Sequence, residues 1–380
     1  MHRTLVLLLA AMCVVPAVAA AKPNKKVCDD TATGYAHCNA RVITDAKGDP
    51  AATKAPSGYG PADLQAAYGL PSSSAGGQKV FAIVDAYDDP NAAADLSTYR
   101  AQFGLSSCTT TTGCFRKVNQ SGSTSPLPRA NGGWAQEISL DLDMASATCP
   151  NCQILLVEAN SNSFTDLAAA EDTAAALGAN VISNSYGGSE FAQETSQTYN
   201  SHFNHPDVAI TVSTGDSGYG VEFPASSQYV TAVGGTSLTK SGSAYSERAW
   251  SGAGSGCSAY VGKPSWQHDS GCARRTVADV SAVADPNTGV AVYDSYRYQG
   301  AAGWMVFGGT SASAPIIGSV YALSGNTSGY ANALPYQHSS ALFDVTSGSD
   351  GTCPTTQWCT ARAGWDGPTG LGSPNGVSGF

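Results

Sequence analysis

The sequence predicts an α/β fold, with one domain in which a central, mostly parallel β-sheet carries helices on both faces. The first observation is a series of short apolar runs with the length of buried strands. The second is that helical stretches separate several of these runs, an alternation typical of parallel sheets. The third is that no internal repeat or low-complexity linker divides residues 57–380, so we expect a single domain there.

The elements can be followed in chain order. The first helix is predicted at residues 61–68, where the pattern is amphipathic, and the first strand at 79–85, an apolar run of the kind buried on both faces of a parallel sheet. Further strands are predicted at 154–157, 181–183, 208–212 and 229–233, and further helices at 134–147, at 164–177 and after Gly309, where an extended segment (304–307) precedes residues 316–323.

The N-terminal residues predict export. A positive Arg3, an apolar run over residues 5–15 and the small-x-small triplet 17–19 are typical of a secretory signal peptide over residues 1–20. That run is too short for a mature membrane helix, and no later stretch is apolar enough for one. We therefore expect a secreted, extracellular protein with no membrane partner. Residues 21–56 are polar and without periodicity, and are expected to form a short lead-in or reduced prosegment before the domain at 57–380.

The cysteines agree with export. Once Cys13 leaves with the signal, ten remain in five successive close pairs, an even number suited to an oxidising compartment. Pairing of nearest neighbours needs the shortest loops, although the sequence alone does not fix the connectivity. Cys149 and Cys152 form a CxxC motif that could instead serve redox chemistry or bind a metal, but no second CxxC or His-rich partner lies near it.

Composition excludes one class of partner. Charged residues make up 13% of the chain and the net charge is −10, so no basic stripe is present to meet nucleic-acid phosphates. Few ionisable groups also mean a small change of net charge between neutral and acidic pH, which favours a protein that tolerates acid.

Ser311 is the candidate nucleophile. It lies in Gly-Thr-Ser-Ala-Ser-Ala-Pro (309–315), between an extended segment and a clear helix, and Pro315 suits the first turn of that helix. Backbone N–H groups at a helix N-terminus can stabilise a developing oxyanion. The alternative is an ordinary N-cap serine.

A nucleophilic serine needs a base, and histidine is the usual one. None of the six histidines lies in a His-Gly-Thr-like segment that opens a helix: His2, His37, His202, His205, His268 and His338. Asp85, at the end of the first predicted strand, therefore lacks a histidine partner.

Glu137 and Asp141 offer another solution, since residues four apart share one face of a helix. Paired carboxylates can share a proton, and one can accept a serine proton in acid, where a histidine would already be protonated. The alternative is an acidic, solvated helix face.

Asp216 is the fourth candidate. It follows a predicted strand in Thr-Gly-Asp-Ser-Gly, at a strand carboxyl end, where open α/β sheets place their sites. A protonated Asp216 could donate a hydrogen bond to an oxyanion, whereas a turn aspartate is the structural alternative.

Together these segments resemble the sedolisin (serine-carboxyl peptidase) family, whose fold is subtilisin-like. The resemblance runs from Tyr59 to Pro374 in the order of the family and rests on six segments: Glu137-x-x-x-Asp141, 215–218, 223–236, 278–286, 309–315 and 364–374. It implies that Ser311 is the nucleophile, Glu137 the general base and acid, Asp141 its orienting partner and Asp216 the oxyanion donor.

The resemblance also implies one structural calcium ion. The matching ligands are the side chains of Asp344 and Asp366 with the carbonyls of Val345 and Gly364, an all-oxygen set that suits Ca2+. Arg362 departs from the family pattern, which often has glycine there, so its side chain must point away from the ion. Residues 21–56 depart as well, because the family is usually made with a long folded propeptide.

The implied function is a secreted, acid-active serine endopeptidase that acts on protein or peptide substrates through an acyl-enzyme, and we expect a monomer. Two alternatives stay open: a secreted peptidase-like binding protein without turnover, and a tripeptidyl-type exopeptidase. A glycosidase that uses Glu137 and a second carboxylate would leave the Ser311 segment unexplained.

Overall fold

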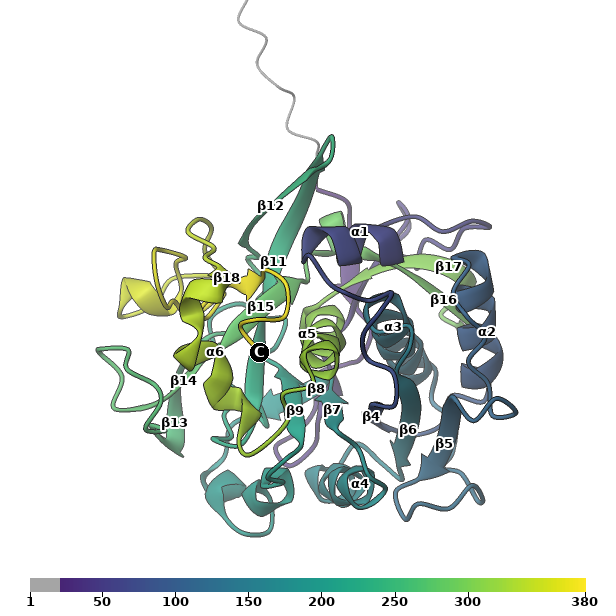
Figure 1. Cartoon of the computed structure of the whole chain (residues 1–380), viewed down its shortest axis with the longest axis horizontal. Helices are drawn as coiled ribbons and strands as arrows, with labels where there is room; N and C mark the ends of the chain where they lie inside the picture. Colours follow the sequence, from purple (N-terminus) through teal and green to yellow (C-terminus); the bar gives the residue numbers. More distant parts are fainter. Residues whose placement is uncertain (1–20) are drawn as a thin grey trace, which may run out of the picture.

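The computed structural model describes residues 21–380, so the predicted signal peptide at residues 1–20 lies outside the described residues. A central sheet of eight strands forms the middle of the domain (Figure 1). Along the sheet the strands run β12 (Ala244–Ala249), β11 (Thr231–Ser241), β9 (Ala209–Ser213), β7 (Val181–Asn184), β4 (Val80–Ala86), β6 (Gln153–Ala159) and β5 (Phe115–Asn119), and β15 (Val280–Val283) also pairs with β11. All pairings are parallel except that of β11 with β12. The predicted fold class is confirmed.

Burial of the strands explains their composition. β4, β6, β7 and β9 are buried at almost every position, and helices cover the sheet on both faces, so both sets of alternating side chains must be apolar or paired. Helices α3 (Gly132–Thr148) and α5 (Thr310–Ser324) pack on each other and against β4, while α4 (Phe164–Ala176) packs against β4 and β6. The remaining helices are α1 (Pro61–Ala67), α2 (Ala92–Gln102) and α6 (Leu334–Gln337).

Two helix starts have clear local causes. The Asn131 side chain accepts hydrogen bonds from the backbone N–H groups of Gly133 and Trp134, and it thereby fixes the first turn of α3. The Ser163 side chain accepts one from Asp166 and starts α4 in the same way. The cap at Asn131 sets the register of α3, and with it the direction of the acidic residues that this helix carries.

Residues 21–56, expected to be irregular, form three short strands: β1 (Asn24–Lys26), β2 (His37–Cys38) and β3 (Arg41–Ile43). Strands β1 and β3 join β17 (Ala301–Gly308) and β16 (Val290–Tyr298) in the order β1-β3-β17-β16. Strand β2 joins β8 (Tyr186–Ser189) and β10 (Glu222–Phe223). Two strand pairs complete the structure, β13 (Gly256–Gly262) with β14 (Arg274–Val277) and β18 (Leu342–Phe343) with β19 (Ser373–Pro374). The segment, purple in Figure 1, thus packs into the domain, and Val27, Cys38 and Val42 belong to its apolar core.

The structure departs from the sequence prediction at several strands. β11 begins at Thr231, two residues after the predicted start, and extends to Ser241. The β16–β17 hairpin is longer than the predicted extended segment at 304–307, and β5 was not predicted because its Phe-Arg-Lys-Val-Asn sequence is largely polar.

Five disulfides join nearest neighbours: Cys28–Cys38, Cys108–Cys114, Cys149–Cys152, Cys257–Cys272 and Cys353–Cys359. The CxxC motif is therefore a closed bridge, at the C-terminal end of α3. Over residues 21–380, no helix combines the length and the apolar character needed to cross a membrane.

Candidate active site

Helix α3 carries the two predicted carboxylates into the protein interior. Glu137 and Asp141 are both 0% exposed. The interpretation of this pair as a solvated acidic face is therefore wrong, because the helix packs between α5, β4 and β16 and is buried along almost its whole length. Asp143 points elsewhere, as predicted, and accepts a hydrogen bond from the backbone N–H of Tyr293 at 2.9 Å.

Ser311 is the second residue of α5 and is fully buried. Pro315 was predicted to lie in the first turn of the helix. That prediction is wrong, because Pro315 is the sixth residue of α5. A proline there cannot donate to the carbonyl four residues earlier, which is that of Ser311. The Ser185 hydroxyl fills this gap by donating to the Ser311 carbonyl oxygen at 3.3 Å.

Ser185 also links the nucleophile to the carboxylates. Its one hydroxyl proton is shared between the Ser311 carbonyl and the closer Oδ1 of Asp141, at 2.8 Å, and its own carbonyl oxygen accepts the Ser311 hydroxyl at 3.0 Å. Ser185 follows β7 at its carboxyl end, Asp85 is the last residue but one of β4, and Asp216 follows β9, so the site forms where parallel strands end. Ser185 was not predicted as a site residue, although its position just after a predicted strand was a usable signal.

Three buried carboxyl groups, those of Asp85, Glu137 and Asp141, interact at this site. Burial and the charges of Asp141 and Asp85 raise the pKa of Glu137 well above its usual range. Both of its carboxylate oxygens are buried and have no hydrogen-bond partner among the described residues. Burial also raises the pKa of Asp141, against a hydrogen bond from Ser185, and the pKa of Asp85 rises through burial and the charge of Asp141. Ionised carboxylates this close repel one another, so the group retains protons well above pH 4.

Asp216 lies beside the start of α5. Its Oδ1 accepts from the backbone N–H of Thr310 at 2.7 Å and from the Thr310 hydroxyl at 3.0 Å. Burial raises the pKa of Asp216 to about 7, although these hydrogen bonds and the charge of Arg41 lower it. Below that pH, Asp216 is a neutral carboxylic acid that can donate a hydrogen bond.

A peptide carbonyl lies at the nucleophile. The backbone N–H of Ser311 donates to the carbonyl oxygen of Asn39 at 2.9 Å, and the Asn39 N–H donates to the Ser185 carbonyl at 3.1 Å. The Asn39 amide donates to the Ser213 hydroxyl at 3.0 Å and to Oε2 of Glu222 at 3.1 Å. A cavity of about 280 Å³ opens beside Glu222. The sequence offers no signal for this role of Asn39, because the contact spans more than 270 positions.

Three of the described histidines have other partners. His202 and His205 contact Asp172 at 2.6 and 3.1 Å, and His37 contacts Glu222 at 3.4 Å. Among residues 21–380, the Ser311 hydroxyl donates to the Ser185 carbonyl oxygen and not to a histidine.

The predicted calcium ligands lie on two neighbouring loops, one directly after β18 and one around residues 364–366. Oδ2 of Asp344 accepts from the N–H of Gly364 at 2.9 Å, and Asp366 accepts from the N–H groups of Arg362 and Thr369 at 2.9 and 3.0 Å. Burial raises the pKa of Asp366 to about 7, and the charge of Asp344 adds to this rise. The two carboxylates are therefore close, as oxygen ligands of one cation must be. Arg362 is exposed, in keeping with a side chain directed away from this site.

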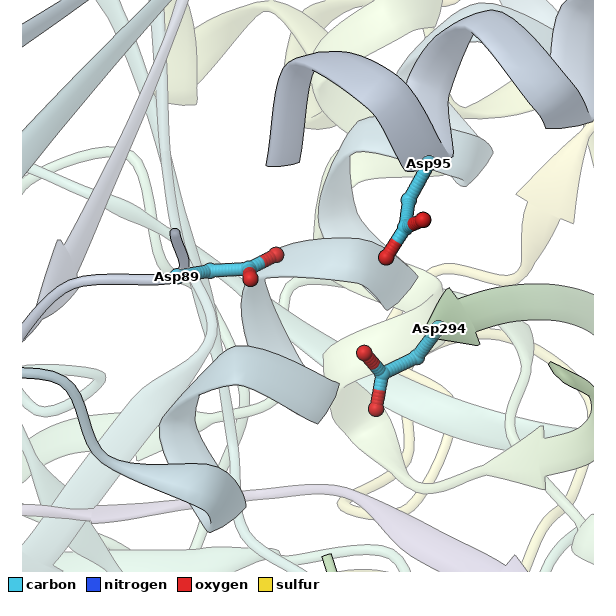
Figure 2. Close-up of side chains that lie close together, drawn as sticks. All are labelled: Asp89, Asp95 and Asp294. Carbon is cyan, nitrogen blue, oxygen red and sulfur yellow. The ribbon is translucent and has the colours of Figure 1, made fainter. Parts of the chain in front are cut away.

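A second acidic cluster lies elsewhere and was not predicted. Asp89, Asp95 and Asp294 are buried, with carboxylate oxygens within 4.8 Å of one another. Figure 2 shows the three side chains turned toward a common space. Burial raises the pKa of Asp89 to about 7 and that of Asp294 to about 8, in each case with help from neighbouring carboxylates. The oxygen-rich cluster could hold a hard cation or shared protons.

Comparison with known proteins places this geometry in a family. The subtilase family matches residues 130–345. Kumamolisin of Bacillus sp. (strain MN-32) is 31% identical over 364 residues, which cover 85% of this chain and 63% of kumamolisin. Tripeptidyl-peptidase 1 of Homo sapiens is 30% identical over 210 residues, 44% of this chain and 36% of that protein. The chain thus spans less than two thirds of either relative.

A solved structure supports the same relationship. Pseudomonas sedolisin, described as a serine-carboxyl proteinase complexed with two molecules of pseudo-iodotyrostatin, superposes with a TM-score of 0.71 at 27% identity, over 84% of this chain and 96% of that one. Three observations support this relationship: the fold, the buried acidic pair beside a serine at a helix start, and the length of chain that the family matches. The chain belongs to the subtilase family, in its sedolisin (serine-carboxyl peptidase) branch.

Proposed function

We propose that this protein is a secreted serine-carboxyl endopeptidase that cleaves protein or peptide substrates at acidic pH through Ser311, Glu137 and Asp141. One observation carries the proposal: the N–H of Ser311 holds a peptide carbonyl oxygen at 2.9 Å, in a site whose neighbouring acids are fully buried. An amide bond presented to a nucleophile in this way is the arrangement that acyl transfer needs.

The proposed reaction follows from the roles of the side chains. Glu137 and Asp141 share a proton, and with that proton on Asp141 the Glu137 carboxylate accepts the Ser311 proton while Ser311 attacks the carbonyl carbon. Asp141, fixed by the Ser185 hydroxyl, orients Glu137 and shares a proton with it. The Ser311 N–H and a protonated Asp216 stabilise the oxyanion. Glu137 then protonates the leaving amine, and water hydrolyses the acyl-enzyme by the same steps.

Action within a chain is favoured over removal of tripeptides. Residues on both sides of Asn39 continue through the site, so the groove around Ser311 accommodates a polypeptide that has no terminus there. A tripeptidyl exopeptidase needs a group that binds a substrate N-terminus near the third residue. The observed passage of the chain therefore supports the endopeptidase proposal.

The proposal includes one structural calcium ion, bound by Asp344 and Asp366 with the carbonyls of Val345 and Gly364. Two adjacent carboxylates and an exposed loop fit a hard cation, which would offset their repulsion and join the loop after β18 to that around Asp366. Secretion rests on the signal-like residues 1–20 and is supported by the five disulfides.

The decisive test compares the wild-type protein with Ser311→Ala at about pH 4, with a denatured protein as substrate and circular dichroism as the check of folding. The wild type should release peptides, and the folded variant should release none. Activity that persists in Ser311→Ala would show a different nucleophile. A wild type that binds the substrate without cleaving it would favour the peptidase-like binding protein.

A further inference from the structure

We infer that the Asn39–Ala40 bond is a cleavage site for the chain's own Ser311, and that residues 36–42 lie in the site as its substrate. The inference rests on the proposed peptidase function and adds to it a specific bond and a fate for the fragment that precedes it. Its support comes from contacts on both sides of that bond.

The residues before the bond lie as a bound peptide strand. His37 and Cys38 pair antiparallel with Gly187 and Tyr186 of β8. Next to them the Asn39 N–H donates to the Ser185 carbonyl, and on the outer side Ala36 exchanges hydrogen bonds with Asn162. Addition of an extended strand to a sheet edge is a general mode of peptide recognition, in which backbone bonds supply affinity and alternate side chains enter pockets.

The carbonyl of Asn39 lies where the oxyanion would form. Its oxygen accepts the Ser311 N–H at 2.9 Å. A Cβ placed on Gly309 would lie 2.2 Å from this oxygen and 2.5 Å from Oδ2 of Asp216, so both oxygens approach the same glycine. Gly309 has φ +97°, a conformation that suits glycine, and its missing side chain leaves room for them. A proton on Oδ2 of Asp216 would turn this approach into a hydrogen bond.

The residues after the bond are held as well. In β3, Arg41 pairs with Gly308 and Val42 with Phe307, just before Ser311 in the chain. The Asn39–Ala40 bond is thus flanked by paired backbone on both sides. The Asn39 side chain, just before this bond, donates hydrogen bonds to Ser213 and Glu222. The pocket at these two residues therefore accepts a side chain that donates hydrogen bonds.

The cleavage balances with water as the co-substrate. Ser311 Oγ attacks the Asn39 carbonyl carbon and gives its proton to Glu137. The bond to the Ala40 nitrogen breaks, that nitrogen leaves as an amine with the proton from Glu137, and Asn39 remains as an ester on Ser311. Water then attacks the ester, which frees the Asn39 carboxyl group and restores the Ser311 hydroxyl.

The fragment that ends at Asn39 should stay bound after cleavage. The Cys28–Cys38 bridge closes within that fragment and stiffens the residues before the bond. Strand β1 of the fragment pairs with β3 on the other side of the bond, and Arg41 Nε donates to Oδ1 of Asn24 at 2.8 Å. Both new ends are therefore held near Ser311, and the retained fragment blocks other substrates until it dissociates.

The test uses the full chain as wild type and as Ser311→Ala, both brought to pH 4, then reduced and denatured for intact mass and N-terminal sequencing. The wild type should yield a fragment that ends at Asn39 and a chain that begins at Ala40, and Ser311→Ala should stay intact at this bond. Before denaturation the two pieces should coelute in gel filtration. Separation without denaturant would refute retention.

Hydrolysis of an added denatured protein, measured in parallel, separates this inference from the proposed function. If the added protein is cut while the Asn39–Ala40 bond stays intact, the inference fails and the function stands. Cleavage of the bond in both wild type and Ser311→Ala would also overturn the inference, since Ser311 would not be responsible. If the wild type cuts neither, both fail.

A second variant tests the role of the bridge. Cys28→Ser with Cys38→Ser should speed the onset of activity on the added protein by at least roughly tenfold, because the loosened fragment dissociates sooner. The matched control is Cys108→Ser with Cys114→Ser, which removes a short bridge in the loop before β5 and should leave the onset unchanged. Equal onset in all three proteins would refute retention by the bridged segment.

Discussion

Thr310 donates both its backbone N–H, at 2.7 Å, and its hydroxyl, at 3.0 Å, to the same oxygen of Asp216, Oδ1. The other oxygen, Oδ2, is buried and has no hydrogen-bond partner among the described residues. An acid proton therefore belongs on Oδ2, because Oδ1 already accepts two hydrogen bonds. Since Oδ2 lies beside Gly309, next to the carbonyl oxygen of Asn39, Thr310 orients Asp216 to donate into the site.

This arrangement predicts how activity depends on the charge of Asp216. Its pKa is raised to about 7 by burial, so the donor is present in acid and is lost as the pH rises through about 7. Asp216→Ala should lower kcat by roughly 10²–10³-fold, as loss of an oxyanion donor does. Asp216→Asn keeps an N–H donor at every pH, so it should retain more activity than Asp216→Ala and lose less of it toward neutral pH. The measurement is kcat as a function of pH over pH 3–8 for the wild type and both variants. An Asp216→Asn profile with the same shape as that of the wild type would contradict the role of Asp216 as a protonated oxyanion donor.

Glu137 and Asp143 lie in the same buried helix and provide a matched pair of changes. Glu137→Gln removes the proposed base and should reduce kcat by about 10²–10⁴-fold. Asp143→Asn keeps an oxygen that can accept the hydrogen bond from the Tyr293 N–H. Because Asp143 has no proposed part in the reaction, this variant should leave kcat unchanged. Steady-state kinetics at pH 4, with circular dichroism for folding, compares them. Equal losses in both variants would mean that the helix needs its charges for folding, not for catalysis.

The sequence was sufficient for five of the eight strands of the central sheet and for helices α1, α3, α4 and α5, because apolar runs and helical periodicity are local properties. The residues Ser311, Glu137, Asp141 and Asp216 could be identified because each stands at a recognisable place, at a helix start, on one helix face or after a strand. Their roles stay predictions, but hydrogen bonds link three of them to one region: Ser185 contacts both Ser311 and Asp141, and Asp216 accepts from Thr310, the residue before Ser311. Glu137 lies one helical turn from Asp141 in α3.

Long-range contacts set the limit of the sequence analysis. Asn39 reaches Ser311 only through the folded domain, and Ser185 satisfies the carbonyl freed by Pro315 across 126 positions. Strands β1 and β3 escaped prediction because their pairing with each other and with β17, and not their own composition, makes them strands. The cluster of Asp89, Asp95 and Asp294 likewise comes from separate elements.

Removal of calcium should destabilise the protein if Asp344 and Asp366 hold an ion. A ligand present at 100 times its Kd stabilises the folded chain by about 2.7 kcal/mol, so a chelator should lower the Tm by several degrees. The Asp344→Asn variant should show little further loss with chelator. Asp294→Asn serves as the control, since it alters only the other acidic cluster and should keep the full chelator effect. If the chelator left the Tm of the wild type unchanged, the assignment of calcium to Asp344 and Asp366 would be wrong.

Stability should rise as the medium becomes acidic, which is the opposite of ordinary acid denaturation. Burial raises the pKa of Asp216 to about 7 and those of Glu158 and Glu194 to about 8, from usual values of 3.8 and 4.5. Between about pH 4 and 8 the folded chain therefore holds protons that the unfolded chain has released. The resulting stability is fully present below the unfolded pKa values. As the pH rises through this window, each such proton lowers the free energy of unfolding by about 1.4 kcal/mol per pH unit.

The test uses Ser311→Ala with chelator present, to avoid self-digestion and metal effects. Its Tm should be several degrees higher at pH 4.5 than at pH 7. Glu158→Gln should reduce this difference, because it removes one titrating group beside Lys117. A Tm that rises from pH 4.5 to pH 7 would mean that these carboxyl groups are ionised in the folded protein.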